Sequence, residues 1–143
     1  MIEIREAMDE DRVGAWTLLD ASRLPSAGLA RPSTRLWVAR DGTRVVGVAG
    51  FERYGDVALL RSVATAADRR GKGIARSLCG VVLAAARSQG VKRAFLLTEK
   101  AEGFFAKIGF ESLDRSAADP RLLESAEFQI NQCATARLMA RTL

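Results

Sequence analysis

The sequence predicts a mixed α/β fold in which a β-sheet is covered by helices. Runs with strand-like alternation and runs with helical periodicity follow each other in the order strand, helix, three strands, helix, strand, helix, strand, with a further strand near the end. An Asp-Gly dipeptide joins two of these strands, and this pair favours a tight hairpin. The length of 143 residues, with 48% hydrophobic and 27% charged residues, fits one globular domain over residues 1–143.

The first part of the chain is expected to form a strand, a helix and a loop. Residues 2–4 alternate apolar with polar, which is typical of a short strand. A helix is expected over residues 12–22, with Asp9 or Asp11 as its cap. Residues 24–33 contain proline and glycine and are predicted to be a loop, long enough to cover a substrate.

A three-stranded meander is expected next. Residues 36–40 and 44–51 are β-rich runs joined by Asp41-Gly42. Residues 54–56, Tyr-Gly-Asp, make a second turn, and residues 57–64 form the third strand. The two turns predict that these three strands run antiparallel.

The second half is expected to open with the strongest helix of the chain. Apolar residues recur at helical spacing over residues 73–89, and Gly90 is placed to end the helix. Shorter elements follow: a buried strand at 91–98, a helix at 101–107 ended by Gly109, a strand at 110–113, a brief helix at 120–128 and a closing strand at 135–142.

Composition argues against several classes of protein. No run of about 18 apolar residues could span a bilayer, and residues 1–11 lack the features of a secretory signal, so a cytoplasmic protein is expected. There is no histidine, and the two cysteines form no CxxC pair, which argues against a metal site, haem or a histidine-based triad. Cys79 fits a helix core, and neither it nor Cys133 is assigned a role.

The positive charge is concentrated where a phosphate would bind. The net charge is +5, and its densest cluster is Arg69, Arg70 and Lys72, beside Gly71 and Gly73. A strand leads into this cluster and a helix follows it, so unpaired amides and the helix dipole face the loop. Other basic residues are scattered and do not alternate with aromatics, so a local phosphate site is favoured over a nucleic-acid surface.

The glycine spacing separates this loop from two other phosphate-binding motifs. A P-loop requires GxxxxGK followed by Ser or Thr, and a dinucleotide fold requires GxGxxG; neither fits. Residues 70–75, Arg-Gly-Lys-Gly-Ile-Ala, instead resemble the R/Q-x-x-G-x-G/A signature of GNAT acetyltransferases. The resemblance implies that coenzyme A binds here by its pyrophosphate, and that the fold is a twisted sheet of six to seven strands with about four helices. It also implies a splayed central strand pair.

The resemblance assigns further cofactor contacts on both sides of this loop. Residues 101–110, AEGFFAKIGF, resemble the second cofactor segment of the family, A-x-x-x-Y-x-x-x-G-F. The strand before the loop is implied to hold the pantetheine arm through its backbone. The implied cofactor residues are Ser62, Val63, Ala64, Thr65, Arg69, Arg70, Gly71, Lys72, Gly73, Ile74, Ala75, Thr98, Phe104 and Phe105.

Two of these positions depart from the family pattern. Thr98 stands where members often have an asparagine that contacts the cofactor, and Phe105 stands where they often have a tyrosine that protonates the leaving thiolate. Phenylalanine has no proton to give, so water or another group serves as the acid, or the thiolate leaves unaided. A thiolate is a fair leaving group because thiol pKa values lie near about 8.5.

The segments around these two positions resemble those of one subgroup of the family. Residues 97–100, Leu-Thr-Glu-Lys, together with the Phe-Phe pair and residues 110–113, are similar to N-acetylglutamate synthases and to small arsenic-resistance-associated acetyltransferases, which also lack the tyrosine. This resemblance implies acetyl transfer to the amino group of an amino acid or amino-acid-like compound.

Candidate residues for the acceptor side come from charge and position. Glu52, which is favoured, and Glu99 are the candidate general bases, since both lie near strand ends. The carboxylate of an amino-acid substrate needs N–H donors, which Arg61, Arg53 or Lys100 can supply. Arg61 interrupts an apolar strand, so it faces either a cleft or solvent. Tyr54, the only tyrosine, is a further substrate candidate.

Alternatives remain open at this stage. They are a peptide or protein N-acetyltransferase, a sensor that binds acetyl-CoA without catalysis, and a nucleic-acid-binding protein whose affinity falls steeply with salt. No membrane partner is expected. A homodimer is expected by analogy with relatives, many of which pair through sheet edges or the last strand, and residues 135–142 are the candidate interface.

Overall fold

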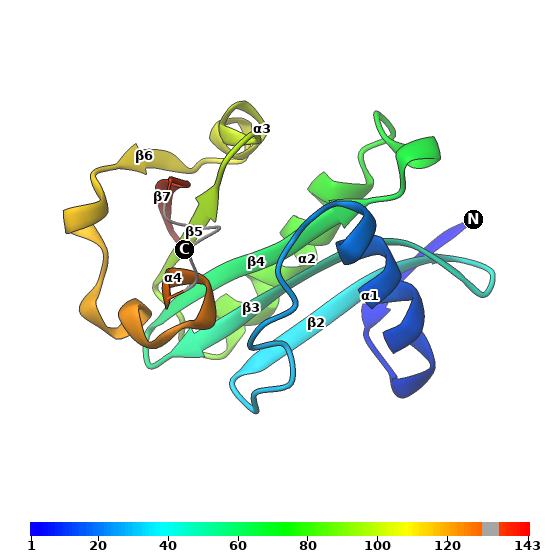
Figure 1. The fold of residues 1–143 in the computed structure, drawn as a ribbon, viewed down its shortest axis with the longest axis horizontal. Helices are drawn as coiled ribbons and strands as arrows, with labels where there is room; N and C mark the ends of the chain where they lie inside the picture. Colours follow the sequence, from blue (N-terminus) through cyan, green and yellow to red (C-terminus); the bar gives the residue numbers. More distant parts are fainter. Residues whose placement is uncertain (130–134) are drawn as a thin grey trace.

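The computed structural model describes residues 1–129 and 135–143 of the chain. The strands are β1 (Ile2–Glu6), β2 (Thr34–Asp41), β3 (Arg44–Tyr54), β4 (Val57–Thr65), β5 (Arg93–Thr98), β6 (Glu111–Leu113) and β7 (Arg137–Thr142). The α-helices are α1 (Arg12–Ala21), α2 (Ile74–Ser88), α3 (Glu102–Lys107) and α4 (Ala126–Gln129). Figure 1 shows one sheet, in the order β1-β2-β3-β4-β5-β7-β6, with helices on both faces. The predicted mixed, mostly antiparallel fold is confirmed.

The first four strands form an antiparallel meander, as the sequence predicts. Asp41 still pairs with Arg44 in the ladder, so the loop of the first hairpin is Gly42-Thr43, one position later than Asp41-Gly42. Only Gly42 has a positive φ there, at 63°. The second turn lies at residues 55–56, within the expected 54–56, because Tyr54 still pairs with Val57 in the ladder.

The two longer helices cover opposite faces of the sheet. In Figure 1, α1 lies in front of the meander and α2 lies behind it. Ala15 and Leu19 of α1 are buried against one face, and Leu78 and Val82 of α2 are buried against the other. Apolar burial on both faces explains why β3 and β4 read as nearly continuous hydrophobic runs.

The start of α1 differs from the expected cap. Asp11 precedes the helix, but its side chain makes no capping bond to it. Instead, the Met8 amide donates to Asp11 Oδ2 at 2.8 Å, and Arg5 and Arg40 form ion pairs with this carboxylate at 3.1 and 3.3 Å. Asp11 is almost fully buried, and its carboxylate forms ion pairs with these arginines of β1 and β2 instead of capping the helix.

The parallel strands β4 and β5 separate after a short contact. They pair only over residues 57–59 and 93–95 and then diverge. On its other side, β4 carries an extra residue against β3, because Val48 pairs with Ala64 while Gly50 pairs with Arg61. Ser62, within this bulge, has a φ of 61°, which is rare for a residue other than glycine. The predicted splayed strand pair is confirmed.

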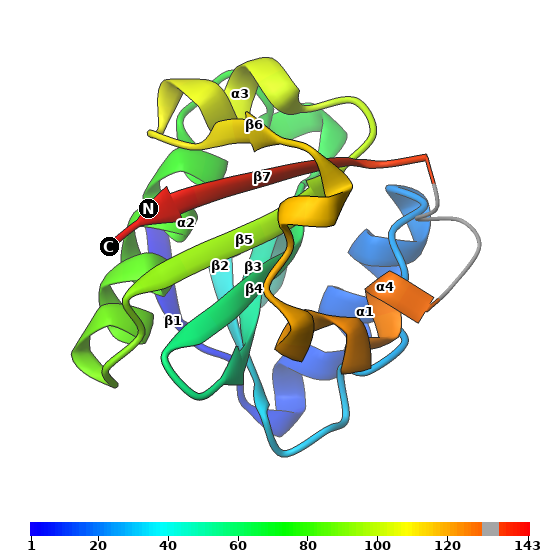
Figure 2. The ribbon, with the colours of Figure 1, turned by 90° about the vertical axis from the view of Figure 1, so that its left-hand side faces the viewer.

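The last strand lies inside the sheet. Figure 2 shows β7 running between β5 and β6, and it pairs with both. A role of residues 135–142 in a dimer interface stays a prediction. The strands at the edges of the sheet are β1 and β6.

The segment between β6 and β7 is more broken than the single brief helix expected over residues 120–128. A 3₁₀ turn, Pro120–Glu124, is followed by Ser125 in an extended conformation and then by α4. Cys133, with the rest of residues 130–134, lies outside the described residues. Among the described helices, none is long and apolar enough to cross a membrane.

Candidate active site

The predicted phosphate loop lies open at the start of α2. Gly71 and Gly73 have φ angles of 78° and 80°, and a Cβ built on either meets no atom within 4 Å. Ser77 donates to the Gly73 carbonyl at 3.0 Å, so the amides of residues 74–76 have no partner within the helix. Exposed amides at a helix start suit an anion such as a pyrophosphate.

The three basic residues of the loop are held differently. Arg69 pairs with Asp41 at 2.7 Å, which lowers the pKa of that carboxyl group. Arg44 holds Asp68 by two hydrogen bonds and lowers its pKa to about 2. Arg70 and Lys72 are exposed, with no side-chain partner among the described residues, and remain free to meet an anion. Arg69 thus anchors the loop, while Arg70 and Lys72 give it positive charge.

The splayed strands provide a second surface suited to the cofactor. Beyond Leu59, β4 has no ladder with β5, so backbone groups of residues 62–65 that face β5 have no strand partner among the described residues. The left-handed Ser62 turns the strand at this point. An extended, amide-containing chain such as a pantetheine arm can pair with an unpaired strand edge of this kind.

The family positions on β5 and α3 have contrasting environments. Thr98 Oγ1 accepts a hydrogen bond from the Ala101 amide at 3.1 Å, which leaves its hydroxyl proton free to donate. Phe105 is 6% exposed and packs edge-on against Phe104 and Phe110, with ring centroids 5.0 and 5.9 Å away. Phe105 is therefore a core residue in this chain.

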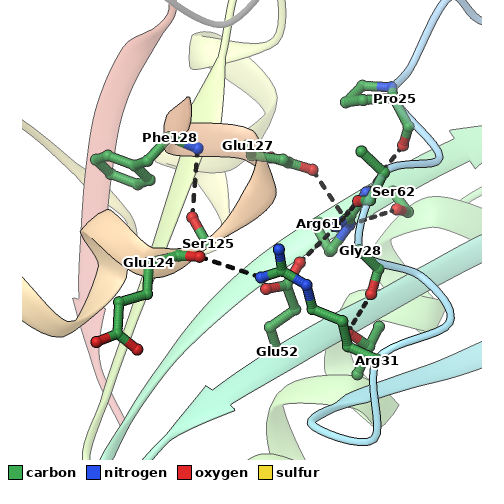
Figure 3. A network of polar contacts seen from close by, with 12 residues as sticks. Pro25, Gly28, Arg31, Glu52, Arg61, Ser62, Glu124, Ser125, Glu127 and Phe128 are labelled. Atoms are coloured by element: carbon green, nitrogen blue, oxygen red, sulfur yellow. Dashed lines mark hydrogen bonds and ion pairs between the residues drawn. The ribbon is translucent and has the colours of Figure 1, made fainter. Parts of the chain in front are cut away.

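A buried ionic cluster lies on the face of the sheet opposite α2. Arg61 of β4 forms ion pairs with Glu52 of β3 at 2.5 Å and with Glu127 of α4 at 3.2 Å (Figure 3). The side chains of Arg61 and Glu52 are fully buried, and that of Glu127 is 7% exposed. Arg61 Nε also donates to Ser62 Oγ at 3.0 Å, and the Tyr54 hydroxyl donates to Glu52.

The cluster also holds the loop predicted to cover a substrate. Arg61 donates to the carbonyl oxygens of Pro25 and Ala27, at 2.9 and 2.5 Å. A Cβ built on Gly28 would lie 3.0 Å from Arg61 Nη1 and 3.2 Å from Ala126 Cβ, so the loop packs closely against both β4 and α4. Arg61 thus faces the interior, and most of its N–H groups already have protein partners.

The charges of the cluster do not balance. Two carboxylates share one guanidinium, and burial raises the pKa of Glu127 to about 7, with Glu52 adding to the rise and Arg61 opposing it. Burial and the bond to Glu52 also raise the pKa of Tyr54. A carboxyl group that titrates near neutrality can exchange a proton at physiological pH.

The remaining predicted residues lie apart from this cluster. Glu99 and Lys100 are exposed and line a cleft of about 620 Å³ between the end of β5, the start of α3 and β7. Glu99 accepts a hydrogen bond from the Thr135 hydroxyl at 3.2 Å, and Arg137 pairs with Glu102 across the same cleft at 2.9 Å. Glu52, Tyr54 and Arg61 therefore come together, while Glu99 and Lys100 form a separate group.

Sequence reasoning missed Glu127. The residue lies in a short segment without a motif, and only its position between Ala126 and Phe128 hinted at burial. Its partners are distant in sequence, since β3, β4 and α4 meet only in the folded chain. Cys79 is buried in α2, as predicted for a core residue, and burial raises the pKa of its thiol to about 12.

Comparison with known proteins now decides the family. The model of the acetyltransferase (GNAT) family matches residues 1–110, more than three quarters of the chain. The chain belongs to the GNAT family. Its class is therefore that of acetyl-CoA-dependent N-acetyltransferases, and the resemblance found in the sequence is confirmed. Among curated proteins, none matches this GNAT sequence.

Solved structures share the fold at low sequence identity. N-acetylglutamate synthase from Neisseria gonorrhoeae, complexed with coenzyme A and N-acetyl-glutamate, matches 100% of the chain with a TM-score of 0.84 and 17% identity. The chain spans only 35% of that enzyme. Rv2747 from Mycobacterium tuberculosis, complexed with coenzyme A, has a TM-score of 0.82 and 21% identity over 99% of both chains. A GNAT acetyltransferase from Staphylococcus aureus has a TM-score of 0.81 and 16% sequence identity. The match covers 100% of this chain and 99% of that one.

Proposed function

We propose that this protein transfers an acetyl group from acetyl-CoA to the amino group of a small amino acid or amino-acid-like compound. The observation that carries the proposal is the combination of an open helix start at residues 71–76 with splayed strands beside a left-handed Ser62. The acceptor class is supported by the sequence resemblance to N-acetylglutamate synthases and by the N-acetylglutamate synthase among the similar folds.

Different parts of coenzyme A would be held by different groups of residues. Amides of residues 74–76, with Arg70 and Lys72, would hold the pyrophosphate, while Ile74 and Ala75 contribute backbone only. Residues 62–65 would hold the pantetheine arm, and Thr98 can donate to it. When bound, acetyl-CoA supplies a thioester whose C–S bond breaks as the acceptor nitrogen forms a C–N bond with the acetyl carbon.

The protein's part in the chemistry is to orient the acceptor and to manage protons. An unpaired amide at the β4 bulge is suited to polarise the acetyl carbonyl. Phe105 has no proton to offer the leaving thiolate, so protonation there falls to water. The acceptor amine loses one proton, and we propose that its base belongs to the buried cluster around Glu52 rather than to Glu99. The cluster directly adjoins the bulge through Ser62.

The acceptor contacts follow from which cations are free. Arg61 is engaged by carbonyl oxygens and carboxylates, so we propose that it shapes the acceptor pocket with Tyr54. Lys100 is exposed in the separate cleft beside α3, so its contact with an acceptor carboxylate stays a prediction. We further propose that residues 1–143 are one domain. Cytoplasmic location and homodimer formation stay predictions.

The test is thiol release from acetyl-CoA with free amino acids, amino-acid analogues and short peptides, with acetyl-CoA binding measured by calorimetry. Turnover with free amino acids supports the proposal, and preferential turnover of peptides moves the acceptor to a polypeptide. Tight binding without turnover by any acceptor favours a sensor. No binding of acetyl-CoA would overturn the proposed function.

A further inference from the structure

We propose that Glu127 is the catalytic base of this chain, the group that accepts the proton lost by the acceptor amine. The inference rests on the acetyl transfer proposed above. It assigns Glu52 and Arg61 as positioning residues, which fix the place and charge of Glu127 without receiving the proton themselves.

Glu127 lies close to the β4 bulge. Arg61 Nε lies 3.2 Å from Glu127 Oε2 and 3.0 Å from Ser62 Oγ, so both oxygen atoms meet at one nitrogen (Figure 3). The carboxylate of α4 is thereby next to Ser62 in the bulge, on the part of β4 that no longer pairs with β5. A base must lie within hydrogen-bond reach, directly or through one water, of the amine that attacks the thioester at this point.

The two carboxylates of the cluster differ in their contacts. Glu52 uses both oxygens, one toward Arg61 and one toward the Tyr54 hydroxyl. Glu127 touches Arg61 through Oε2, and no hydrogen-bond donor reaches its Oε1 among the described residues. A carboxylate with a free oxygen can take up a proton without breaking a protein contact, and Glu52 cannot.

The environment of Glu127 sets its charge. Arg61 of β4 and Glu52 of β3 act on it directly. Next to these groups, Tyr54 donates to Glu52, Arg31 donates to the Glu124 carbonyl, and Arg115 lies over the ring of Phe128. Burial raises the pKa of Glu127 to about 7 despite the nearby guanidinium. A base with a pKa near the working pH combines a sufficient ionised fraction with adequate proton affinity.

The balance of the step is simple. The acceptor amine gives its lone pair to the acetyl carbon, the C–S bond breaks, and the sulfur leaves as a thiolate. The proton released from nitrogen bonds to Glu127 Oε1, converting the carboxylate to a carboxylic acid. Water then takes the proton and restores the base, and no oxidant or metal is needed.

The test compares Glu127→Gln with Glu124→Gln, an exposed neighbour in the 3₁₀ turn before α4. Both variants are first checked for acetyl-CoA affinity and thermal unfolding. Glu127→Gln should lower kcat by about 10²–10³-fold and remove a limb near pH 7 from the kcat profile, because the base is missing. Glu124→Gln should keep the wild-type kcat, and Glu127→Asp should recover part of the loss with an altered limb.

A second measurement does not depend on turnover. Carbon-13 NMR of glutamate carboxyl groups should show one resonance that titrates near pH 7 in the wild type and is lost in Glu127→Gln. Wild-type kcat in a folded Glu127→Gln that still binds acetyl-CoA would overturn the proposal, as would a Glu127 carboxyl that titrates like the exposed ones. Failure of the proposed function would appear differently, as absence of turnover in the wild type with every acceptor.

Discussion

The glycine loop proposed to bind the cofactor and the buried ionic cluster are built by opposite means. Residues 70–76 present backbone amides at an exposed helix start, with glycines that keep side chains away. The cluster of Glu52, Arg61 and Glu127 is made of charged side chains, brought from three elements and removed from water. One half of the proposed site therefore depends on backbone conformation and the other half on long-range packing. The two halves should therefore fail in different ways when changed.

The largest effect is expected from breaking the cluster at its centre. Arg61→Met leaves two buried carboxylates without their cation and releases the carbonyls of Pro25 and Ala27. Removing one partner of a buried ion pair costs about 3–5 kcal/mol. Urea unfolding should show this loss, while the control Arg53→Met, at an exposed position in β3, should lose less than about 1 kcal/mol. Equal losses would mean that the cluster does not stabilise the fold.

The pH dependence of stability should separate the cluster from the exposed loop. The pKa of Glu127 is raised in the folded state, to about 7 from an ordinary 4.5, so folding favours its protonated form. The contribution of Glu127 to the free energy of unfolding is therefore fully present below pH 4.5 and is lost as the pH rises through 7. The change in the free energy of unfolding is about 3 kcal/mol. Relative to the wild type, Glu127→Gln should gain about this amount between pH 5 and 8.

Glu124→Gln is the control for this linkage because its side chain is exposed. Its free energy of unfolding should follow the wild type across the same pH range. A wild-type curve parallel to that of Glu127→Gln would show that Glu127 ionises at its ordinary pH. The cluster would then hold both carboxylates charged.

The opposite failure is expected in the loop. Gly73→Val places a β-branched residue at a φ of 80°, which distorts the helix start that presents the amides. Acetyl-CoA affinity should fall by at least about 100-fold, or about 2.7 kcal/mol. No neighbouring atom lies within 4 Å of the new Cβ, so the fold should survive and the far-UV spectrum should be unchanged. Unchanged affinity would place the pyrophosphate elsewhere.

The unpaired positive charge of the loop should make a smaller contribution to the affinity for acetyl-CoA. Lys72→Ala removes an exposed ammonium group that no described side chain engages, so acetyl-CoA affinity should fall by about 3–10-fold at low salt and less at high salt. The control is Lys92→Ala. Lys92 is an exposed lysine just before β5, and its amide donates to the Asp56 carbonyl at the end of β4 that lies away from the loop. An equal loss in both variants would indicate a general effect of net charge.

The same contrast explains what could be read from the sequence. The loop is local: its glycines, basic residues and following helix are adjacent in the chain, so spacing alone predicted its conformation. The meander, α2 and the order of elements were likewise predicted by periodicity. The hairpin loop was off by one residue because Asp41 remains in the ladder.

Long-range contacts explain the errors. Which strand lies beside β5 depends on the return of the chain after α4, so β7 was predicted as a strand but its place between β5 and β6 was not. Glu127 has no local signal, because its burial comes from packing of α4 on β4 and on the loop at residues 24–33. Asp11 could be placed before α1, but its pairing with Arg5 and Arg40 could not.

The smallest effect is expected where the family pattern itself is restored. Phe105→Tyr adds the hydroxyl that many relatives carry, yet the ring lies in the core between Phe104 and Phe110. Since proton removal by the cluster and departure of a thiolate do not use this position, kcat should change by less than about 3-fold, with stability lowered by about 1 kcal/mol if the hydroxyl lacks a partner. A large rise in kcat would show that protonation of the thiolate limits turnover. The rate would then be controlled on the cofactor side of the site, and the buried cluster would matter for folding more than for rate.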